Sequence, residues 1–174
     1  GWTAWEPNSQ RLVYMRNGET FRSPDDRKRL GTYDLLMTDR DGSVVCNFVH
    51  RASDPSWSPD GSVLFYQSYT APTDWNTNFD QLDLRVVQKD GTNARILHRG
   101  NPRSGFQRVQ ALPGGRVAFV EGQSNLAVID SALGVVASNI KSLFPSRDPS
   151  SSGYPNVSFQ FSPDGNRLAY SVVD

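Results

Sequence analysis

The segment WSPDGSVLFY, residues Trp57–Tyr66, decides the fold, because it recurs almost unchanged as FSPDGNRLAY at Phe161–Tyr170. More divergent copies are WEPNSQRLVY at Trp5–Tyr14 and ALPGGRVAFV at Ala111–Val120. The proline of each copy follows the previous one after 52, 54 and 50 residues. Four copies at so regular a spacing indicate that the chain is built from an internal repeat.

Each copy of the motif predicts a β-hairpin. In Ser-Pro-Asp-Gly the proline presets φ for the second position of a turn, and the glycine takes the left-handed conformation that reverses the chain. An aromatic residue ends the strand before the turn, and alternating apolar residues such as Val63 and Phe65 begin the strand after it. We therefore predict that Pro59-Asp60-Gly61 and Pro163-Asp164-Gly165 are structural turns.

A second set of turns gives each repeat two more strands. Asp-Gly turns at 38–42 and 88–91 each separate two apolar runs, and 131–134 has the same place in the third copy. No long segment shows the 3.6-residue period of an amphipathic helix, and we expect at most one helical turn, near 139–144. Each repeat thus predicts four antiparallel strands.

A four-stranded antiparallel unit repeated every ~40 to 50 residues is typical of a β-propeller blade. The core [W/F]-S-P-D-G-x-x-[L/I]-x-[Y/F], at 57–66 and 161–170, resembles the WD40-like (PD40) repeat of the TolB-like β-propeller family. The resemblance covers nearly the whole chain and implies one all-β domain over 1–174. Its blades are expected at roughly 2–51, 52–104 and 105–142, with a half blade at 155–174.

About three and a half blades is an awkward number, because propellers close with about four to eight blades. An open stack leaves unpaired edges at both ends. Three explanations stay open: the polypeptide continues, a partner covers the edges, or a four-bladed ring closes imperfectly.

Composition excludes several classes of function. The 18 Lys and Arg residues balance 18 Asp and Glu, which argues against a nucleic-acid binder or a polybasic membrane anchor. The single cysteine, Cys46, excludes an intramolecular disulfide and a Cys-based zinc cluster. No apolar run is long enough for a transmembrane helix, so we expect no direct membrane span.

The two histidines occupy equivalent places in successive blades, within Phe48–Arg51 and Ile96–Arg99. A feature that repeats with the blade favours a structural or solvent-exposed role, since an active site is normally single. The functional alternative is a pair of His-Arg dipeptides on one rim, suited to an anionic group.

Motifs for catalysis and cofactor binding are missing. The chain contains no G-x-S-x-G, phosphate loop, H-E-x-x-H or dinucleotide fingerprint. Residues 39–42, DRDG, begin like a calcium loop, but Val44, Val45 and Phe48 are apolar where later ligands belong. We therefore predict no catalytic, metal or cofactor-binding residue and no enzyme activity within this chain.

Long connections fall on one rim of the predicted propeller, opposite the Pro-Asp-Gly turns. They are Arg16–Thr32, Ser68–Gln81 and Lys141–Asn156, whereas the third blade needs only 122–125. Long loops on a rigid scaffold often carry binding, and exposed aromatic and arginine residues anchor interfaces. The predicted partner-binding residues are Arg22, Arg27, Lys28, Arg29, Tyr69, Trp75, Phe79 and Tyr154.

Other assignments are possible for some of the aromatic residues. Trp75 and Phe79 have the alternative of folding back to cover their own blade. Trp2, Trp5 and Trp57 are assigned to packing between blades.

These observations favour a non-enzymatic scaffold that binds a protein partner, or an accessory subunit that stabilises a membrane-associated assembly. The TolB-like resemblance implies a periplasmic or otherwise extracytoplasmic location. The alternative is the propeller domain of a larger hydrolase, such as a prolyl-oligopeptidase-like peptidase, with its catalytic domain outside these residues.

Overall fold

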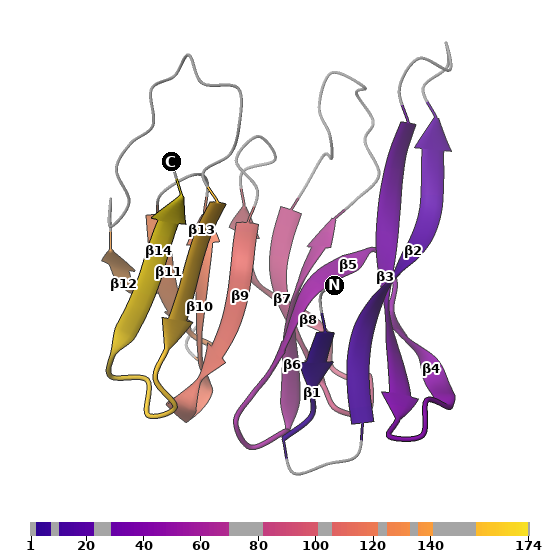
Figure 1. Cartoon of the computed structure of the whole chain (residues 1–174), viewed down its shortest axis with the longest axis horizontal. Coiled ribbons are helices and arrows are strands. Elements are labelled where there is room, and N and C mark those ends of the chain that lie inside the picture. Colours follow the sequence, from indigo (N-terminus) through magenta and orange to yellow (C-terminus); the bar gives the residue numbers. More distant parts are fainter. Residues whose placement is uncertain are drawn as a thin grey trace.

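The computed structural model describes residues 3–7, 11–22, 29–69, 82–100, 106–121, 125–132, 136–140 and 156–173. They form three four-stranded antiparallel sheets and one two-stranded sheet, arranged side by side in chain order (Figure 1). Each sheet is a blade, and the predicted all-β propeller with about three and a half blades is confirmed.

In every blade the strands pair in chain order. Blade 1 contains β1 (Thr3–Trp5), β2 (Arg11–Arg22), β3 (Arg29–Asp39) and β4 (Val44–Val49). Blade 2 contains β5 (Ala52–Trp57), β6 (Val63–Tyr69), β7 (Leu82–Gln88) and β8 (Arg95–Gly100). Blade 3 contains β9 (Phe106–Leu112), β10 (Arg116–Glu121), β11 (Asn125–Asp130) and β12 (Val136–Ile140). The half blade contains β13 (Asn156–Phe161) and β14 (Leu168–Val173).

The first strands of successive blades, β1, β5, β9 and β13, contact one another, so they form the inner side of the stack. The one helical turn of the described residues is the 3-10 turn η1 (Pro113–Gly115). Of the helical turn predicted near 139–144, residues 139 and 140 belong to β12, which pairs with β11, and 141–144 lie outside the described residues.

The Pro-Asp-Gly turns form as predicted. Gly61 and Gly165 have φ of 70° and 71°, in the left-handed region. The Asp60 carboxylate accepts hydrogen bonds from the Ser58 hydroxyl and the Ser62 N–H, and these bonds hold its pKa below the ordinary value. The same N–H bond recurs from Ser43 to Asp41, from Thr92 to Asp90 and from Asn166 to Asp164. These aspartates are therefore parts of turns, Asp41 of the DRDG segment included.

The third copy of the repeat is one residue shorter than the sequence comparison implies. Trp57 pairs with Leu64, seven residues later, whereas Ala111 pairs with Val117, six residues later. The tighter connection is η1, in which two consecutive glycines have positive φ. The residues of β10 are therefore shifted by one position relative to the ungapped alignment.

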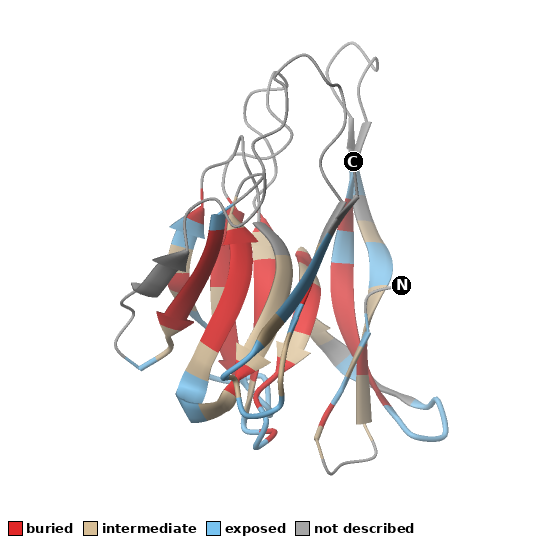
Figure 2. Cartoon of the chain, turned by 60° about the vertical axis from the view of Figure 1, so that its left-hand side comes forward, coloured by how far each residue is buried: buried red, intermediate tan, exposed pale blue. Residues whose placement is uncertain are grey.

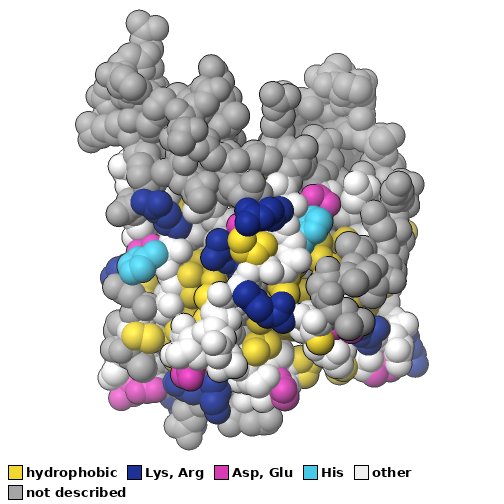
Figure 3. All heavy atoms as spheres, turned by 180° about the vertical axis from the view of Figure 1, so that it is seen from behind, with side chains coloured by type: hydrophobic (Ala, Val, Ile, Leu, Met, Phe, Trp, Pro, Cys, Tyr) yellow, Lys and Arg dark blue, Asp and Glu magenta, His cyan; other side chains and the backbone are white. Residues whose placement is uncertain are grey.

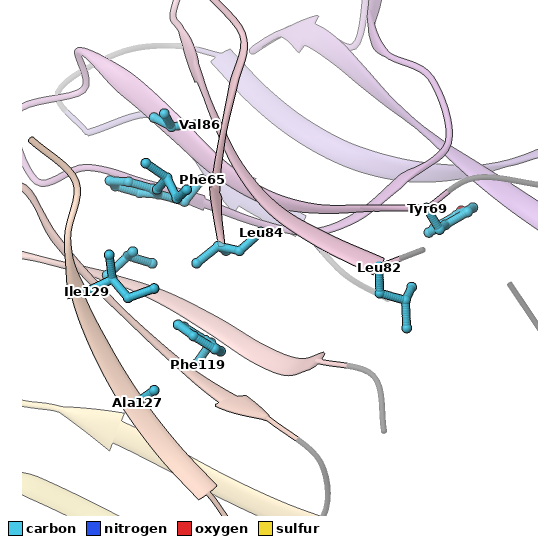
Figure 4. Close-up of a cluster of buried hydrophobic side chains, with 10 residues drawn as sticks. Phe65, Tyr69, Leu82, Leu84, Val86, Phe119, Ala127 and Ile129 are labelled. Carbon is cyan, nitrogen blue, oxygen red and sulfur yellow. The ribbon is translucent and has the colours of Figure 1, made fainter. Parts of the chain in front are cut away.

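Successive residues of β6 point to opposite neighbouring blades, because side chains alternate along a strand. Leu64 and Tyr66 pack on blade 1, and Phe65 packs on blade 3. The core between blades 2 and 3 brings Phe65 against Phe119 and Ile129 (Figure 4). Similar clusters join blades 1 and 2 and blade 3 with the half blade, so the buried residues lie mainly between sheets (Figure 2).

The assignment of tryptophans to these cores is right at one position and wrong at another. Trp57 is 6% exposed and packs against Phe48 of blade 1, with ring centroids 6.2 Å apart. Trp5 holds the equivalent place on blade 1 but is 58% exposed, since no described blade precedes it. Trp2 lies outside the described residues.

Candidate functional site

The predicted insertion Arg16–Thr32 proves to be largely strand. Beyond Asn17 and Tyr33, β2 and β3 pair only with each other, through a bulge and then as far as Arg22 and Arg29. We call residues 17–22 and 29–33 the arm; it projects past its sheet (Figure 1). Both of its backbone edges lack a further strand in the described part of the chain, a geometry that suits strand pairing with a partner.

Few of the predicted partner-binding residues fall where the structure describes side chains. Arg22 and Arg29 face each other as the last strand pair of the arm, where only their backbone is described. The others, Arg27, Lys28, Trp75, Phe79 and Tyr154, lie outside the described residues. Their role as contacts remains a prediction.

Tyr69 is a buried anchor in this structure. Its side chain is 7% exposed, and its hydroxyl accepts a hydrogen bond from the Tyr33 N–H and donates one to the Tyr33 carbonyl, 3.1 Å away. Burial raises the pKa of the Tyr69 phenol, so it stays protonated and able to donate. Tyr69 thus fixes the base of the arm to blade 2. Because its side chain is buried, Tyr69 is not an exposed partner contact in this structure.

The two histidines sit beside carboxylates. His50 Nδ1 lies 3.4 Å from Asp34 Oδ1, and His98 Nε2 lies 3.3 Å from Glu121 Oε1. Seen from behind, the histidines are separated by other side chains (Figure 3). Each acid competes with an external anion for its imidazole, which favours the structural interpretation over an anion site.

A cavity of about 400 Å³ between the inner strands contains an acid and a base that the sequence reasoning missed. Asp54 on β5 and Arg108 on β9 both line it and occupy equivalent positions of adjacent blades. Their backbones are left-handed, with φ of 51° and 57°, and each lies where the strand register shifts at a bulge. Bulges re-aim side chains, and strained non-glycine residues gather at functional sites.

Asp54 is nearly enclosed, at 8% exposure. Burial raises the pKa of its carboxyl to about 7, and the positive charge of Arg108 opposes this rise. The cavity therefore offers a carboxyl that titrates near neutral pH beside a permanent cation. An alignment of the repeats would have placed Asp54 opposite Arg108. However, no sequence pattern shows that an aspartate or an arginine has a left-handed backbone conformation.

Polar side chains of the inner strands join blade 2 to blade 3 and blade 3 to the half blade. Ser56 Oγ accepts a hydrogen bond from the Ala111 N–H at 2.9 Å. At the equivalent place one blade later, Gln110 Oε1 accepts from the Phe161 N–H at 2.9 Å. We call these two contacts the inter-blade clasps. Gln160 has the same place in the half blade and is exposed.

A larger cavity, of about 760 Å³, opens at the opposite rim, where Pro59, Pro113 and Pro163 of three turns approach one another. Arg167 is its charged lining residue. Among the described residues no group of three or more His, Cys, Asp and Glu is placed to hold a metal. The described part of the chain also lacks a helix with the length and apolarity to cross a bilayer.

Comparison with sequences identifies no relative: no family model matches the chain, and no curated protein matches it. Solved structures do match. TolB from Acinetobacter baumannii superposes with a TM-score of 0.60 at 17% identity, over 98% of this chain and 39% of TolB.

Propeller domains of peptidases match equally well. The β-propeller domain of the Trilobed protease from Pyrococcus furiosus gives a TM-score of 0.59 at 10% identity, over 94% of this chain and 46% of that domain. Acylaminoacyl peptidase gives 0.63 at 13% identity, over 99% of this chain and 27% of the peptidase. The chain spans less than half the length of each of these three proteins. It therefore has the β-propeller fold that TolB shares with the propeller domains of peptidases.

Proposed function

We propose that this chain is a non-enzymatic interaction module whose arm-bearing rim holds a protein partner. The observation that carries the proposal is the arm, because its strand pairs continue beyond Asn17 and Tyr33, past the last residues at which β1 and β4 pair with the same two strands. Tyr69 holds the base of the arm in place through both backbone groups of Tyr33. A fixed ribbon with two open edges is suited to binding an extended segment.

The charged and aromatic residues of the same rim are proposed to extend this surface. Arg22 and Arg29 are the last paired residues of the arm, Arg27 and Lys28 lie between them in the sequence, and Trp75, Phe79 and Tyr154 belong to the other long connections. Arginine and aromatic side chains are the types that supply most binding energy at interfaces. Basic residues at the edge of such a surface are expected to act mainly on association rate.

We further propose a location outside the cytoplasm and, as one form of the function, an accessory role in a membrane-associated assembly. Both follow from the resemblance of the repeat to the TolB-like family. Fractionation of cells that make the native protein tests the location, and recovery in the soluble cytoplasmic fraction would contradict it.

The experiment compares two rims of one folded chain. In an armless variant, Asn-Gly replaces residues 18–32 and joins Asn17 to Tyr33, because this dipeptide suits a two-residue hairpin. In the control variant, Arg167→Ala alters the opposite rim. Partners are identified by cross-linking with the unaltered chain, and their affinity for each variant is then measured. The proposal expects the armless chain to lose binding, and Trp75→Ala to weaken it by about 2 kcal/mol. Loss of binding in Arg167→Ala alone would refute it.

A second candidate is the propeller domain of a larger hydrolase, which the similarity to peptidase propellers favours. The intact mass of the native polypeptide separates the two functions. A mass well above 19.4 kDa, together with an α/β segment carrying G-x-S-x-G, supports the hydrolase. A stable complex with another protein and no such segment supports the interaction module.

A further inference from the structure

The smaller cavity, between the inner strands, is formed by three neighbouring blades. Its described lining consists of residues 54–56 of β5, residues 108–111 of β9, and Phe159 and Gln160 of β13. The strand β9 contacts both β5 and β13, and the three lie in one row in the stack (Figure 1). The cavity volume, about 400 Å³, falls within the range of roughly 300–1,000 Å³ that is typical of small-molecule sites.

The lining combines one acid with one permanent cation. Asp54 from β5 and Arg108 from β9 are the charged side chains among the described lining residues. The other described residues that β5, β9 and β13 contribute are uncharged, and both polar and apolar side chains occur among them. A ligand complementary to this lining carries a positive group and a negative group.

The backbone does not explain why these two residues are an acid and an arginine. Asp54 and Arg108 are both left-handed, and both lie at a strand bulge. Glycine and asparagine adopt this conformation most easily, so the bulge alone does not call for a charged side chain. Because bulges redirect side chains, the two blades present opposite charges to the same cavity.

The attraction between Asp54 and Arg108 does not exhaust what either group can bind. A carboxylate has about four acceptor sites and a guanidinium has five N–H donors, which is more than one ion pair uses. The positive charge of Arg108 opposes the effect of burial on Asp54, yet the pKa of the carboxyl is still raised to about 7. The fold therefore only partly compensates the negative charge of Asp54, and a second cation stabilises it.

We propose that this cavity binds a free aliphatic α-amino acid, with its ammonium group on the Asp54 carboxylate and its carboxylate on the Arg108 guanidinium. The two charges of an α-amino acid are one carbon atom apart, which suits an acid and a cation at equivalent positions of adjacent strands. Val109 and Phe159 supply apolar lining for the aliphatic side chain. The site contains no residue of the arm, so the inference goes beyond the proposed function and can fail independently of it.

Calorimetric titration of the full chain with L-valine and two analogues tests the class of ligand. N-acetyl-L-valine lacks the ammonium group, and L-valinamide lacks the carboxylate. L-valine is expected to bind saturably, and each analogue is expected to bind at least about tenfold more weakly, because one charged group of the site loses its counter-charge. Equal affinity for the three compounds, or no saturable binding of L-valine, overturns the proposal.

Two arginine variants make a matched pair. Arg108 and Arg51 both have left-handed backbones, with φ of 57° and 52°, but Arg51 is not part of the described lining. Asparagine accepts this conformation at either position. Arg108→Asn is expected to weaken L-valine binding by about tenfold or more and to remove the preference over L-valinamide. Arg51→Asn is expected to leave the affinity within about threefold, and equal losses in the two variants contradict the site.

The Asp54 carboxyl provides a readout that does not depend on affinity. A ligand ammonium favours the charged carboxylate and lowers its pKa from about 7, so binding at about pH 6.5 is expected to release protons. Arg108 stays charged at this pH. Titrations in buffers with different ionisation enthalpies count the released protons.

The Asp54→Asn variant completes the test, since asparagine keeps the left-handed backbone and removes the titrating group. This variant is expected to release no protons and to lose the preference for L-valine over N-acetyl-L-valine. Proton release that persists in Asp54→Asn contradicts the assignment of the ammonium group to Asp54. If a variant fails to fold, the three compounds titrated into the unaltered chain decide.

Discussion

Gln110 binds both backbone polar groups of Phe161 in the following blade. Its Oε1 accepts a hydrogen bond from the Phe161 N–H at 2.9 Å, and its Nε2 donates to the Phe161 carbonyl at 3.4 Å. This clasp lies beside the core in which Phe159 packs on blade 3. It therefore couples the half blade to the rest of the molecule by polar as well as apolar contacts.

Replacing Gln110 by alanine is expected to destabilise this junction by about 1–3 kcal/mol, because the Phe161 N–H loses its acceptor. Urea unfolding and hydrogen exchange of the Phe161 amide measure the effect. Gln160→Ala is the control: the exposed Gln160 amide donates to the same Phe161 carbonyl at 3.3 Å but does not bind the Phe161 N–H, so a change within about 0.5 kcal/mol is expected. Equal effects of the two substitutions would show that the Gln110 clasp does not stabilise this junction.

Asp54→Asn is expected to stabilise the fold above neutral pH and to flatten its pH dependence. The folded carboxyl has a pKa of about 7 against an ordinary value of 3.8. Between these values the unfolded chain releases its proton first, so stability falls as pH rises through this window. The shift corresponds to at most about 4 kcal/mol. Asparagine removes the charge and still accepts a left-handed backbone.

Thermal unfolding of Asp54→Asn from pH 4 to pH 8 provides the measurement. Asp60→Asn is the contrast: hydrogen bonds hold the pKa of Asp60 below its ordinary value of 3.8, so this substitution is expected to lower stability by a nearly constant amount from pH 4 to pH 8. A pH profile of Asp54→Asn that parallels the unaltered chain would show that this carboxyl does not govern stability in the window.

Trp57→Ala and Trp5→Ala are predicted to differ strongly although the two residues are equivalent in the repeat. Trp57 fills the core between blades 1 and 2, and truncating a buried tryptophan costs about 3–5 kcal/mol. Trp5 is mostly exposed, so its truncation is expected to cost less than about 1 kcal/mol. Chemical denaturation of both variants tests the contrast, which would vanish if another chain covered Trp5 in the sample.

Gly61→Val tests the structural role of the Pro-Asp-Gly turn. A side chain at Gly61 is forced into φ of 70°, which costs about 1–2 kcal/mol, and its Cβ meets the Pro7 carbonyl at 3.4 Å. Gly31→Val is the matched control, since its Cβ has no neighbour within 4 Å and its φ is ordinary. The melting temperature should fall for Gly61→Val and not for Gly31→Val. The partner affinity of Gly61→Val, measured per folded molecule, should not change.

The sequence predicted the blades because turn chemistry is local. Proline, aspartate and glycine at fixed offsets specify the reversals, and all of them form at 58–61 and 162–165. The strand register of the third copy was not predicted. Two consecutive glycines can close a turn with one residue fewer, and only strand pairing shows which turn length is used.

Burial and backbone strain were harder to predict, since both depend on contacts distant in the sequence. Trp5 and Trp57 have the same local motif. Trp57 has a preceding blade to pack on, whereas Trp5 has none in the described chain. Tyr69 looked like an exposed aromatic in a long loop, but it ends a strand and reaches Tyr33 across 36 residues. The left-handed backbone of Asp54 arises from a bulge that the residue types at this place do not predict.

The three inter-blade cores have a mechanical consequence, because each joins only two adjacent blades. Tension between the two ends of the chain must pass through these interfaces in series, so the smallest one sets the force at which extension begins. Among the described residues, the half blade supplies Phe159, Phe161 and Leu168 to its interface, and the Gln110 clasp of blade 3 adds its bonds to Phe161. We therefore expect the half blade to detach first under load, before the contacts between the three complete blades are broken.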